Sequence, residues 1–176
     1  MRILVAVAGR HGATREIAEN IATAAGTALT DAGVWSEVEV RDASLVTSVD
    51  GFDAVVLGAA VYMGHWHEPA AKFAEAFADE LRRVPVWVFS SGPVGERGDP
   101  ADEPAGAADV VMRLGARGHR LFGGKLDRHS LHLPERAMVA ALRVKDGDYR
   151  DWPSIRAWGR EIGLSLAKAE VAGSAS

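Results

Sequence analysis

The stretch VAGRHGATREIA, residues 7–18, decides the fold. It completes the apolar run Ile3–Ala8, which is typical of a strand buried on both faces of a sheet. A bend bracketed by Gly9 and Gly12 follows, and apolar residues then recur at helical spacing. The free N–H groups at the start of a helix attract anions, and glycine lets the backbone approach an oxygen closely. This stretch therefore predicts a strand–turn–helix unit with a phosphate at the turn, and a tight turn capped by Thr14 is the alternative.

The alternation of apolar runs and helical periodicity continues along the chain. Further strands are expected at 34–40, 54–61, 84–91 and 119–126, and helices around 13–33, 69–81, 110–114 and 152–170. Five strands interleaved with helices predict an α/β fold, with a doubly wound five-stranded parallel sheet and helices on both faces. No linker or internal repeat divides the sequence. We therefore expect one domain over residues 1–170 and a frayed tail over residues 171–176.

Composition excludes several classes of function. The net charge of −4 and the isoelectric point near 5.9 argue against nucleic-acid binding, which needs a basic surface. The chain has no cysteine, which removes disulfides, thiolate chemistry and Cys-ligated zinc and fits a reducing compartment. No apolar run reaches the roughly 18 residues of a transmembrane segment, and the first residues are too short a run for a signal peptide. We expect a cytoplasmic protein.

The residues at the ends of the second and third buried strands indicate that the ligand has a planar ring in addition to the predicted phosphate. Ligands of open α/β sheets lie beyond the carboxyl ends of the strands. The stretch GAAVYMGHWHEP, residues 58–69, places Tyr62 and Trp66 there, and SSGPVGERGD, residues 90–99, places Gly92 there. Aromatic side chains can stack on a ring, and a glycine-rich backbone can lie flat against it. The three strand ends together suit a mononucleotide with a broad flat ring.

On these motifs the chain resembles the flavodoxin superfamily. GRHGATREIA (9–18), GAAVYMGHWH (58–67) and DWPSIRAWGREI (151–162) are more narrowly similar to the branch of menaquinone-dependent protoporphyrinogen dehydrogenases. The resemblance covers essentially the whole chain and implies a flavodoxin-like fold with FMN as the cofactor. In flavodoxins the phosphate loop reads Ser/Thr-x-Thr-Gly-x-Thr, and two of its hydroxyl positions fall on Gly9 and His11 here.

The resemblance assigns three loops to the cofactor. The implied residues are Arg10, His11, Gly12, Ala13, Thr14, Ala60, Val61, Tyr62, Met63, Gly64, Ser91, Gly92, Pro93 and Val94. Arg10 and His11 can replace the missing hydroxyls as donors, and solvated loop positions are the alternative for both. A flavin carries the electrons itself, so the sequence names no catalytic acid or base.

Three residues beyond the ring are candidate substrate contacts. His65, Trp66 and His67 are expected to project outward from the loop, where a second planar molecule could stack. Capping of the helix that opens at Pro69 is the structural alternative for the two histidines. No metal site is expected, because neither cysteine nor acidic ligands accompany them.

A second cluster of basic residues lies around the last strand and the connection 127–149. It comprises His119, Arg128, His129, His132 and Arg136, and either recognises an anionic substrate or forms a solvated surface. A short amphipathic helix within this connection is suggested by its apolar residues near 137–144. Trp35, Trp87, Trp152 and Trp158 are expected to pack in the core.

Two functional readings follow, from different classes. The first is an FMN-dependent oxidoreductase that transfers electrons between an organic substrate, such as protoporphyrinogen, and a quinone-type acceptor. The second is an electron carrier that docks a redox protein partner. Carriers commonly dock through a strongly acidic face, and a net charge of −4 is mild for that purpose, which favours the enzyme. A third reading, a domain without flavin that binds another anion, follows from Gly9 and His11.

Overall fold

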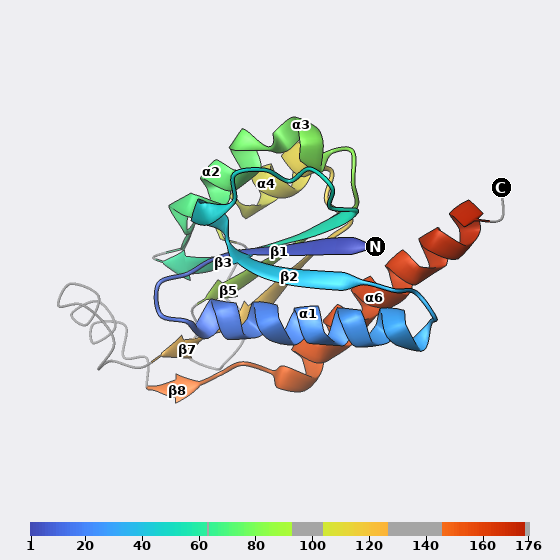
Figure 1. Ribbon diagram of the computed structural model, residues 1–176. Coiled ribbons are helices and arrows are strands. Elements are labelled where there is room, and N and C mark those ends of the chain that lie inside the picture. Colours follow the sequence, from blue (N-terminus) through green and yellow to red (C-terminus); the bar gives the residue numbers. More distant parts are fainter. Residues whose placement is uncertain (63, 93–103, 127–145, 175–176) are drawn as a thin grey trace.

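The chain forms a parallel sheet with helices on both faces (Figure 1). The computed structural model describes residues 1–62, 64–92, 104–126 and 146–174. The parallel strands are β1 (Arg2–Ala8), β2 (Glu37–Asp42), β3 (Ala54–Tyr62), β5 (Val86–Gly92) and β6 (Gly118–Gly123), in the order β2-β1-β3-β5-β6. Counted as five parallel strands, this is the order 2-1-3-4-5 of flavodoxin-like sheets. The predicted fold class is therefore confirmed.

Two groups of helices cover the sheet. The helices α1 (Ala13–Asp31) and α6 (Trp152–Ser174) lie on one face, and α2 (Glu68–Ala76), α3 (Ala78–Leu81) and α4 (Ala107–Leu114) lie on the other (Figure 1). A short 3₁₀ turn, η1 (Ala43–Leu45), follows β2. Side chains of β1, β3 and β5 alternate between the two cores, so these strands are buried on both faces, as their apolar runs predict.

Two short pairings modify the predicted strands. The strand β4 (His65–Trp66) turns back antiparallel onto the end of β3, and β7 (Lys125–Leu126) pairs with β8 (Gly147–Asp148). The last predicted strand, 119–126, is thus divided between β6 and β7. The division has a local cause: the carbonyl oxygen of Tyr149 lies 2.2 Å from where a Cβ on Gly123 would stand. The chain that follows β8 passes Gly123 at this point.

One expectation about the core is wrong. The side chain of Trp35 is 74% exposed, although we expected it in the core. The helix α6 continues to Ser174, so residues 171–174 of the expected frayed tail are helical. Trp87 and Trp158 are buried as expected, and Trp152 is partly buried against the same core.

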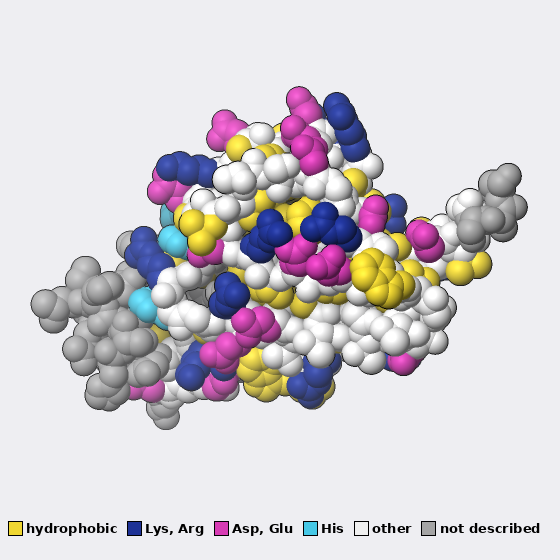
Figure 2. Space-filling model, viewed as in Figure 1, with side chains coloured by type: hydrophobic (Ala, Val, Ile, Leu, Met, Phe, Trp, Pro, Cys, Tyr) yellow, Lys and Arg dark blue, Asp and Glu magenta, His cyan; other side chains and the backbone are white. Residues whose placement is uncertain are grey.

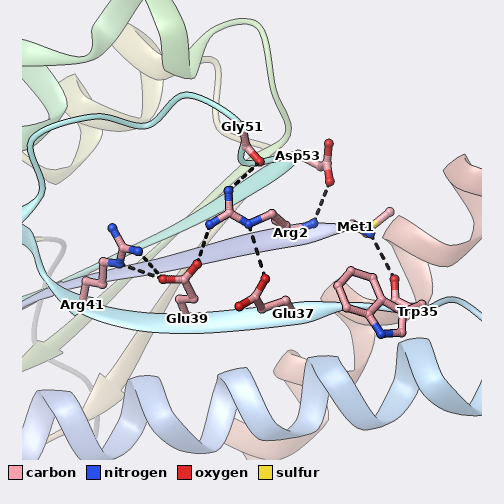
Figure 3. A network of polar contacts seen from close by, with 8 residues as sticks. All are labelled: Met1, Arg2, Trp35, Glu37, Glu39, Arg41, Gly51 and Asp53. Atoms are coloured by element: carbon pink, nitrogen blue, oxygen red, sulfur yellow. Dashed lines mark hydrogen bonds and ion pairs between the residues drawn. The ribbon is translucent and has the colours of Figure 1, made fainter.

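The outer edge of the sheet is lined by paired charges (Figure 3). Nη2 of Arg2 lies 2.8 Å from the Glu39 carboxylate, and Nε of Arg2 lies 3.5 Å from that of Glu37. Arg41 binds Glu39 from the other side and holds the pKa of this carboxyl below its usual range. The amino group of Met1 donates to the carbonyl of Trp35 (Figure 3). Charged side chains along an edge strand discourage pairing with another chain.

The helices α1 and α6 approach each other closely because α6 carries two glycines at the contact. A Cβ on Gly159 would stand 2.6 Å from the carbonyl oxygen of Ile21, and one on Gly163 would stand 2.5 Å from that of Ala25. Such distances are far below van der Waals contact, and the obstacle is backbone that cannot rotate away. Glycine at both positions is therefore a packing requirement.

We expect Gly163→Ala to lower the free energy of unfolding by about 1–3 kcal/mol, because the added methyl group forces the helices apart. Gly173→Ala in the same helix is the matched control, since a Cβ there meets nothing within 4 Å. The control should be neutral or stabilising by up to about 1 kcal/mol, the helix-propensity gain of alanine over glycine. Urea denaturation of both variants measures the difference, and equal free energies of unfolding would contradict the packing argument.

Candidate functional site

The predicted phosphate turn joins β1 to α1 through a left-handed residue. Gly12 has φ 80° and is the N-cap of α1, where it makes no side-chain hydrogen bond to the helix. Its carbonyl accepts the first helical bond, from Glu16 N at 3.0 Å. The first-turn N–H groups of a helix lack partners within the helix, and this N-cap supplies no side chain to satisfy them. The turn therefore presents the donor set that an anion requires.

Thr14 contributes a buried hydroxyl at the same turn. Its side chain is 4% exposed, and its hydroxyl makes no hydrogen bond to the residues that the structure describes. A Cβ on Gly9 would stand 3.0 Å from Thr14 Oγ1, so a side chain at position 9 would crowd this hydroxyl. A buried polar group is costly unless it is hydrogen-bonded, so this hydroxyl is suited to bond with a group from outside the described residues.

Tyr62 connects the first and second strand ends. The amide of Arg10 donates to the phenolic oxygen of Tyr62 at 3.0 Å, and the Arg10 guanidinium lies 5.2 Å from the centre of the tyrosine ring. The rings of His11 and His67 meet Tyr62 edge-on, with centroids 6.3 and 5.3 Å away. The structure thus places one aromatic residue of the second loop directly beside the turn that begins α1.

The second loop is a tight hairpin. Val61 pairs with Trp66 and Tyr62 with His65, and Gly64 turns the chain with φ 78°. Met63 lies outside the described residues. The amide of His67 donates to the carbonyl of Ala60 at 2.9 Å. His67 is the N-cap of α2 by its backbone, but its side chain makes no capping bond, so the imidazole is not used for helix capping.

Trp66 points inward, contrary to the expectation that it projects from the loop. It is 7% exposed and packs in the core between the sheet and α2–α4. Its indole donates to Ser90 Oγ at 2.7 Å, and Ser90 Oγ lies 2.9 Å from His119 Nε2. The signal was present in the sequence, because alternate residues of a strand face opposite sides and His65 and His67 are the outward pair.

His119 consequently belongs to a partly buried hydrogen-bond chain rather than to an open basic patch. The other four members of that predicted patch, Arg128, His129, His132 and Arg136, lie outside the described residues, as does the amphipathic segment near 137–144. Sequence reasoning missed Ser90, which pairs with both Trp66 and His119. A serine inside an apolar run is the signal that could have indicated it.

The third strand end contributes Ser91 and Gly92. Ser91 is 4% exposed, and its hydroxyl makes no hydrogen bond within the described part of the chain. A Cβ on Gly92 would stand 2.4 Å from Val61 Cβ, so glycine is required for β5 to lie against the second loop. Pro93 and Val94 lie outside the described residues. Ala13, Ala60 and Val61 lie at the same edge, at the start of α1 and the end of β3.

Among the residues that the structure describes, no group of three His, Asp or Glu side chains could hold a metal ion. In that same part of the chain, no helix has both the length and the apolar character needed to cross a membrane. Two surface grooves, between α1 and β2 and between α1 and α6, lie along the outer side of α1 and contain none of the predicted site residues.

His67 is held in its neutral form. Burial lowers the pKa of His67, and the positive charge of Arg10 lowers it further, against weaker opposite effects of Asp42 and Glu68. At neutral pH the imidazole can therefore donate one hydrogen bond and accept another. Its ring lies beside Tyr62, at the side of the loop that faces solvent.

The lowered pKa of His67 predicts a pH effect on stability. The unfolded chain takes up a proton near pH 6.5, whereas the native His67 resists it, so the native state loses stability as the pH falls below about 6.5. We expect His67→Gln to lose less thermal stability than the wild type between about pH 7.5 and 5.5. His65→Gln, two residues earlier and exposed, is the control. Identical losses in the wild type and His67→Gln would contradict the prediction.

Relatives of named activity match this chain at low identity over most of its length. The chain is 24% identical over 175 residues to protoporphyrinogen IX dehydrogenase [quinone] of Escherichia coli strain K12, with 92% of this chain and 94% of that protein covered. The same enzyme from Escherichia coli O157:H7 matches equally.

Solved structures support the fold. A flavodoxin from the domain Archaea has a TM-score of 0.58 at 17% identity and covers 96% of this chain and 99% of its own. Oxidised flavodoxin 1 from Bacillus cereus has a TM-score of 0.57 at 17% identity, with 92% of this chain and 97% of its own covered. A family model described as the flavodoxin domain matches residues 4–152. The protein belongs to the flavodoxin domain family.

Proposed function

We propose that the protein is an FMN-dependent oxidoreductase that transfers electrons between an organic substrate and a quinone-type acceptor. A protoporphyrinogen-like tetrapyrrole is the substrate class that the Escherichia coli relative suggests. The observation that carries the proposal is the set of side chains around Tyr62, where Arg10, His11 and His67 converge. Imidazoles and a guanidinium suit a substrate that carries carbonyl or carboxylate groups.

FMN is the cofactor of flavodoxins, and the family gives it to this chain. The described residues fit it, because Gly12 opens the first turn of α1 and the hydroxyls of Thr14 and Ser91 are buried without partners among those residues. In the proposal, the amides of residues 12–14 and the Thr14 hydroxyl hold the phosphate. Tyr62 lies beside the ring, and Ser91 and Gly92 lie along its other side. When bound, FMN supplies the redox chemistry, as electron acceptor and donor.

The surface beyond Tyr62 that His65 and His67 form is called the rim, and we assign it to the second substrate. His65 is exposed and His67 is half-buried, and both lie on the side of β4 opposite to Trp66. A neutral imidazole at His67 can donate a hydrogen bond to a quinone carbonyl. The carboxylates that act on His67 have partners of their own, since Asp42 accepts from Ser44 and Glu68 pairs with Lys72 at 2.8 Å. Figure 2 shows histidine and Lys/Arg side chains gathered at this end of the molecule.

A second candidate function is electron transfer without substrate turnover. It is favoured by the near-complete overlap with single-domain flavodoxins, since 96% of this chain covers 99% of the archaeal protein. The partner would then be a redox protein that docks at the same rim. The two functions predict the same cofactor and differ in whether the histidines affect turnover.

The cofactor assignment is tested at the turn. Purified protein should show a flavin absorbance spectrum and, once stripped, should bind FMN more tightly than riboflavin, because the turn holds the phosphate. Gly12→Val should reduce the affinity for FMN by tenfold or more, about 1.4 kcal/mol, since valine resists φ 80°. The Cβ itself meets nothing within 4 Å, so circular dichroism should show the fold intact. Equal affinity for FMN and riboflavin would refute the phosphate site, whereas binding of neither flavin would favour a domain that uses the pocket for another anion.

The enzyme and carrier functions are separated at the rim. The double variant His65→Ala/His67→Ala should keep its flavin yet reduce a soluble quinone analogue, or oxidise a porphyrinogen, at least tenfold more slowly per bound flavin, because a hydrogen-bond donor to the substrate is lost. Arg160→Ala in α6 is the control, since the Arg160 side chain is exposed and pairs with Asp31 at the end of α1. Unchanged turnover per flavin in the double variant would favour the carrier.

A further inference from the structure

Among the ion pairs of the described residues, those of Arg150 contain the most deeply buried charged side chain. It lies between β8 and α6, and its side chain is 3% exposed. A guanidinium so far from water must be paired, because an isolated buried charge is strongly unfavourable. Its partners therefore show what holds this part of the chain in place.

The guanidinium joins three separate segments. It binds the Asp148 carboxylate through two bonds, Nε to Oδ1 at 2.7 Å and Nη2 to Oδ2 at 2.6 Å. Its Nη1 reaches Glu16 Oε2 at 2.8 Å and the carbonyl oxygen of Ala13 at 3.3 Å. Its flat face lies 4.4 Å from the centre of the Trp152 ring. The first turn of α1 is thus tied to the paired strands β7 and β8 and to the start of α6.

The neighbouring backbone fixes where Arg150 can stand. The amide of Tyr149 donates to the carbonyl of Gly124 at 3.1 Å, and the Tyr149 carbonyl fills the space beside Gly123. Arg150 follows directly, so its position relative to β6 is set before its side chain makes any contact. The hydrogen bond from Arg150 to the Ala13 carbonyl therefore holds the turn at Gly12 in place relative to β6.

The charges of this cluster matter for an anion at that turn. Two carboxylates, of Glu16 and Asp148, face one guanidinium, and the hydrogen bond from Arg150 holds the pKa of Asp148 below its usual range. Glu16 stands in the first turn of α1, the same turn that would receive the phosphate. Without Arg150, both carboxylates would lose their nearest cation beside a dianionic group, and the weaker effect of Lys125 on Asp148 would not replace it.

We propose that Arg150 is a positioning residue for the cofactor phosphate: it braces the Ala13 carbonyl and neutralises Glu16, so that the first turn of α1 can accept a dianion. This inference rests on the assignment of the phosphate to residues 12–14. It adds a residue from the other end of the chain to a site formed by the loops after β1, β3 and β5. Nothing in the motif GRHGATREIA indicates it.

The test compares FMN with riboflavin, which lacks the phosphate. Full-length protein is stripped of flavin, and both affinities are measured by quenching of flavin fluorescence. We expect Arg150→Met to weaken FMN binding about tenfold or more while riboflavin affinity changes less than threefold, because only the phosphate senses the charge. Adding Glu16→Gln to this variant should restore a large part of the FMN preference. Arg120→Met is the matched control, since Arg120 is exposed and lies 3.7 Å from Glu161 on α6.

The outcomes separate this inference from the cofactor assignment. If the wild type binds FMN and riboflavin equally, the phosphate site itself is wrong. If the wild type prefers FMN and Arg150→Met keeps that preference, or loses both ligands equally, the positioning role is wrong. Should Arg150→Met not fold, Glu16→Gln alone decides, because it leaves Arg150 in place and removes one carboxylate. Its FMN affinity should then rise relative to riboflavin, and an unchanged ratio would overturn the inference.

Discussion

The burial of β1 on both faces is the constraint on which the rest of the structure depends. Its side chains enter both cores, and its backbone pairs with β2 on one side and β3 on the other. Because β1 is paired on both sides and covered on both faces, other segments can reach it only at its two ends. The loops after β1, β3 and β5 are therefore brought to one edge of the sheet, because parallel strands all point the same way.

At that edge, the size of one residue depends on the size of its neighbour. Glycine at position 9 removes a hydroxyl that the flavodoxin pattern has, yet it leaves room for the buried hydroxyl of Thr14. Glycine at position 92 in turn leaves room for Val61. In each case a small residue leaves room for a larger one at the site: Thr14 lies on the same turn as Gly9, and Val61 lies on the strand next to Gly92.

The parts of the fold that could be predicted from the sequence are those that a local pattern determines. The buried runs identified β1, β3 and β5, and Pro69 marked the first turn of α2. Trp35 and Trp66 were misassigned for opposite reasons: hydrophobicity alone placed the first inside, and its position in a loop placed the second outside. The contacts of Arg150 with Ala13 and Glu16 span more than 130 positions, and no local pattern carries such information.

The close contact of α1 with α6 has a consequence for the order of events during synthesis. Ile17 and Ile21 of α1 share a core with Ile155, Trp158 and Ile162, near the other end of the chain. At about 5–20 residues per second, a ribosome needs roughly 6–24 s to make the residues that separate these two helices. Throughout that interval the part of the first helix that packs on α6 has no permanent neighbour, although its contacts with β1 and β3 can already form. Exposed apolar surface of this kind is what chaperones bind, so the nascent chain depends on their protection more than a fold with sequential contacts would.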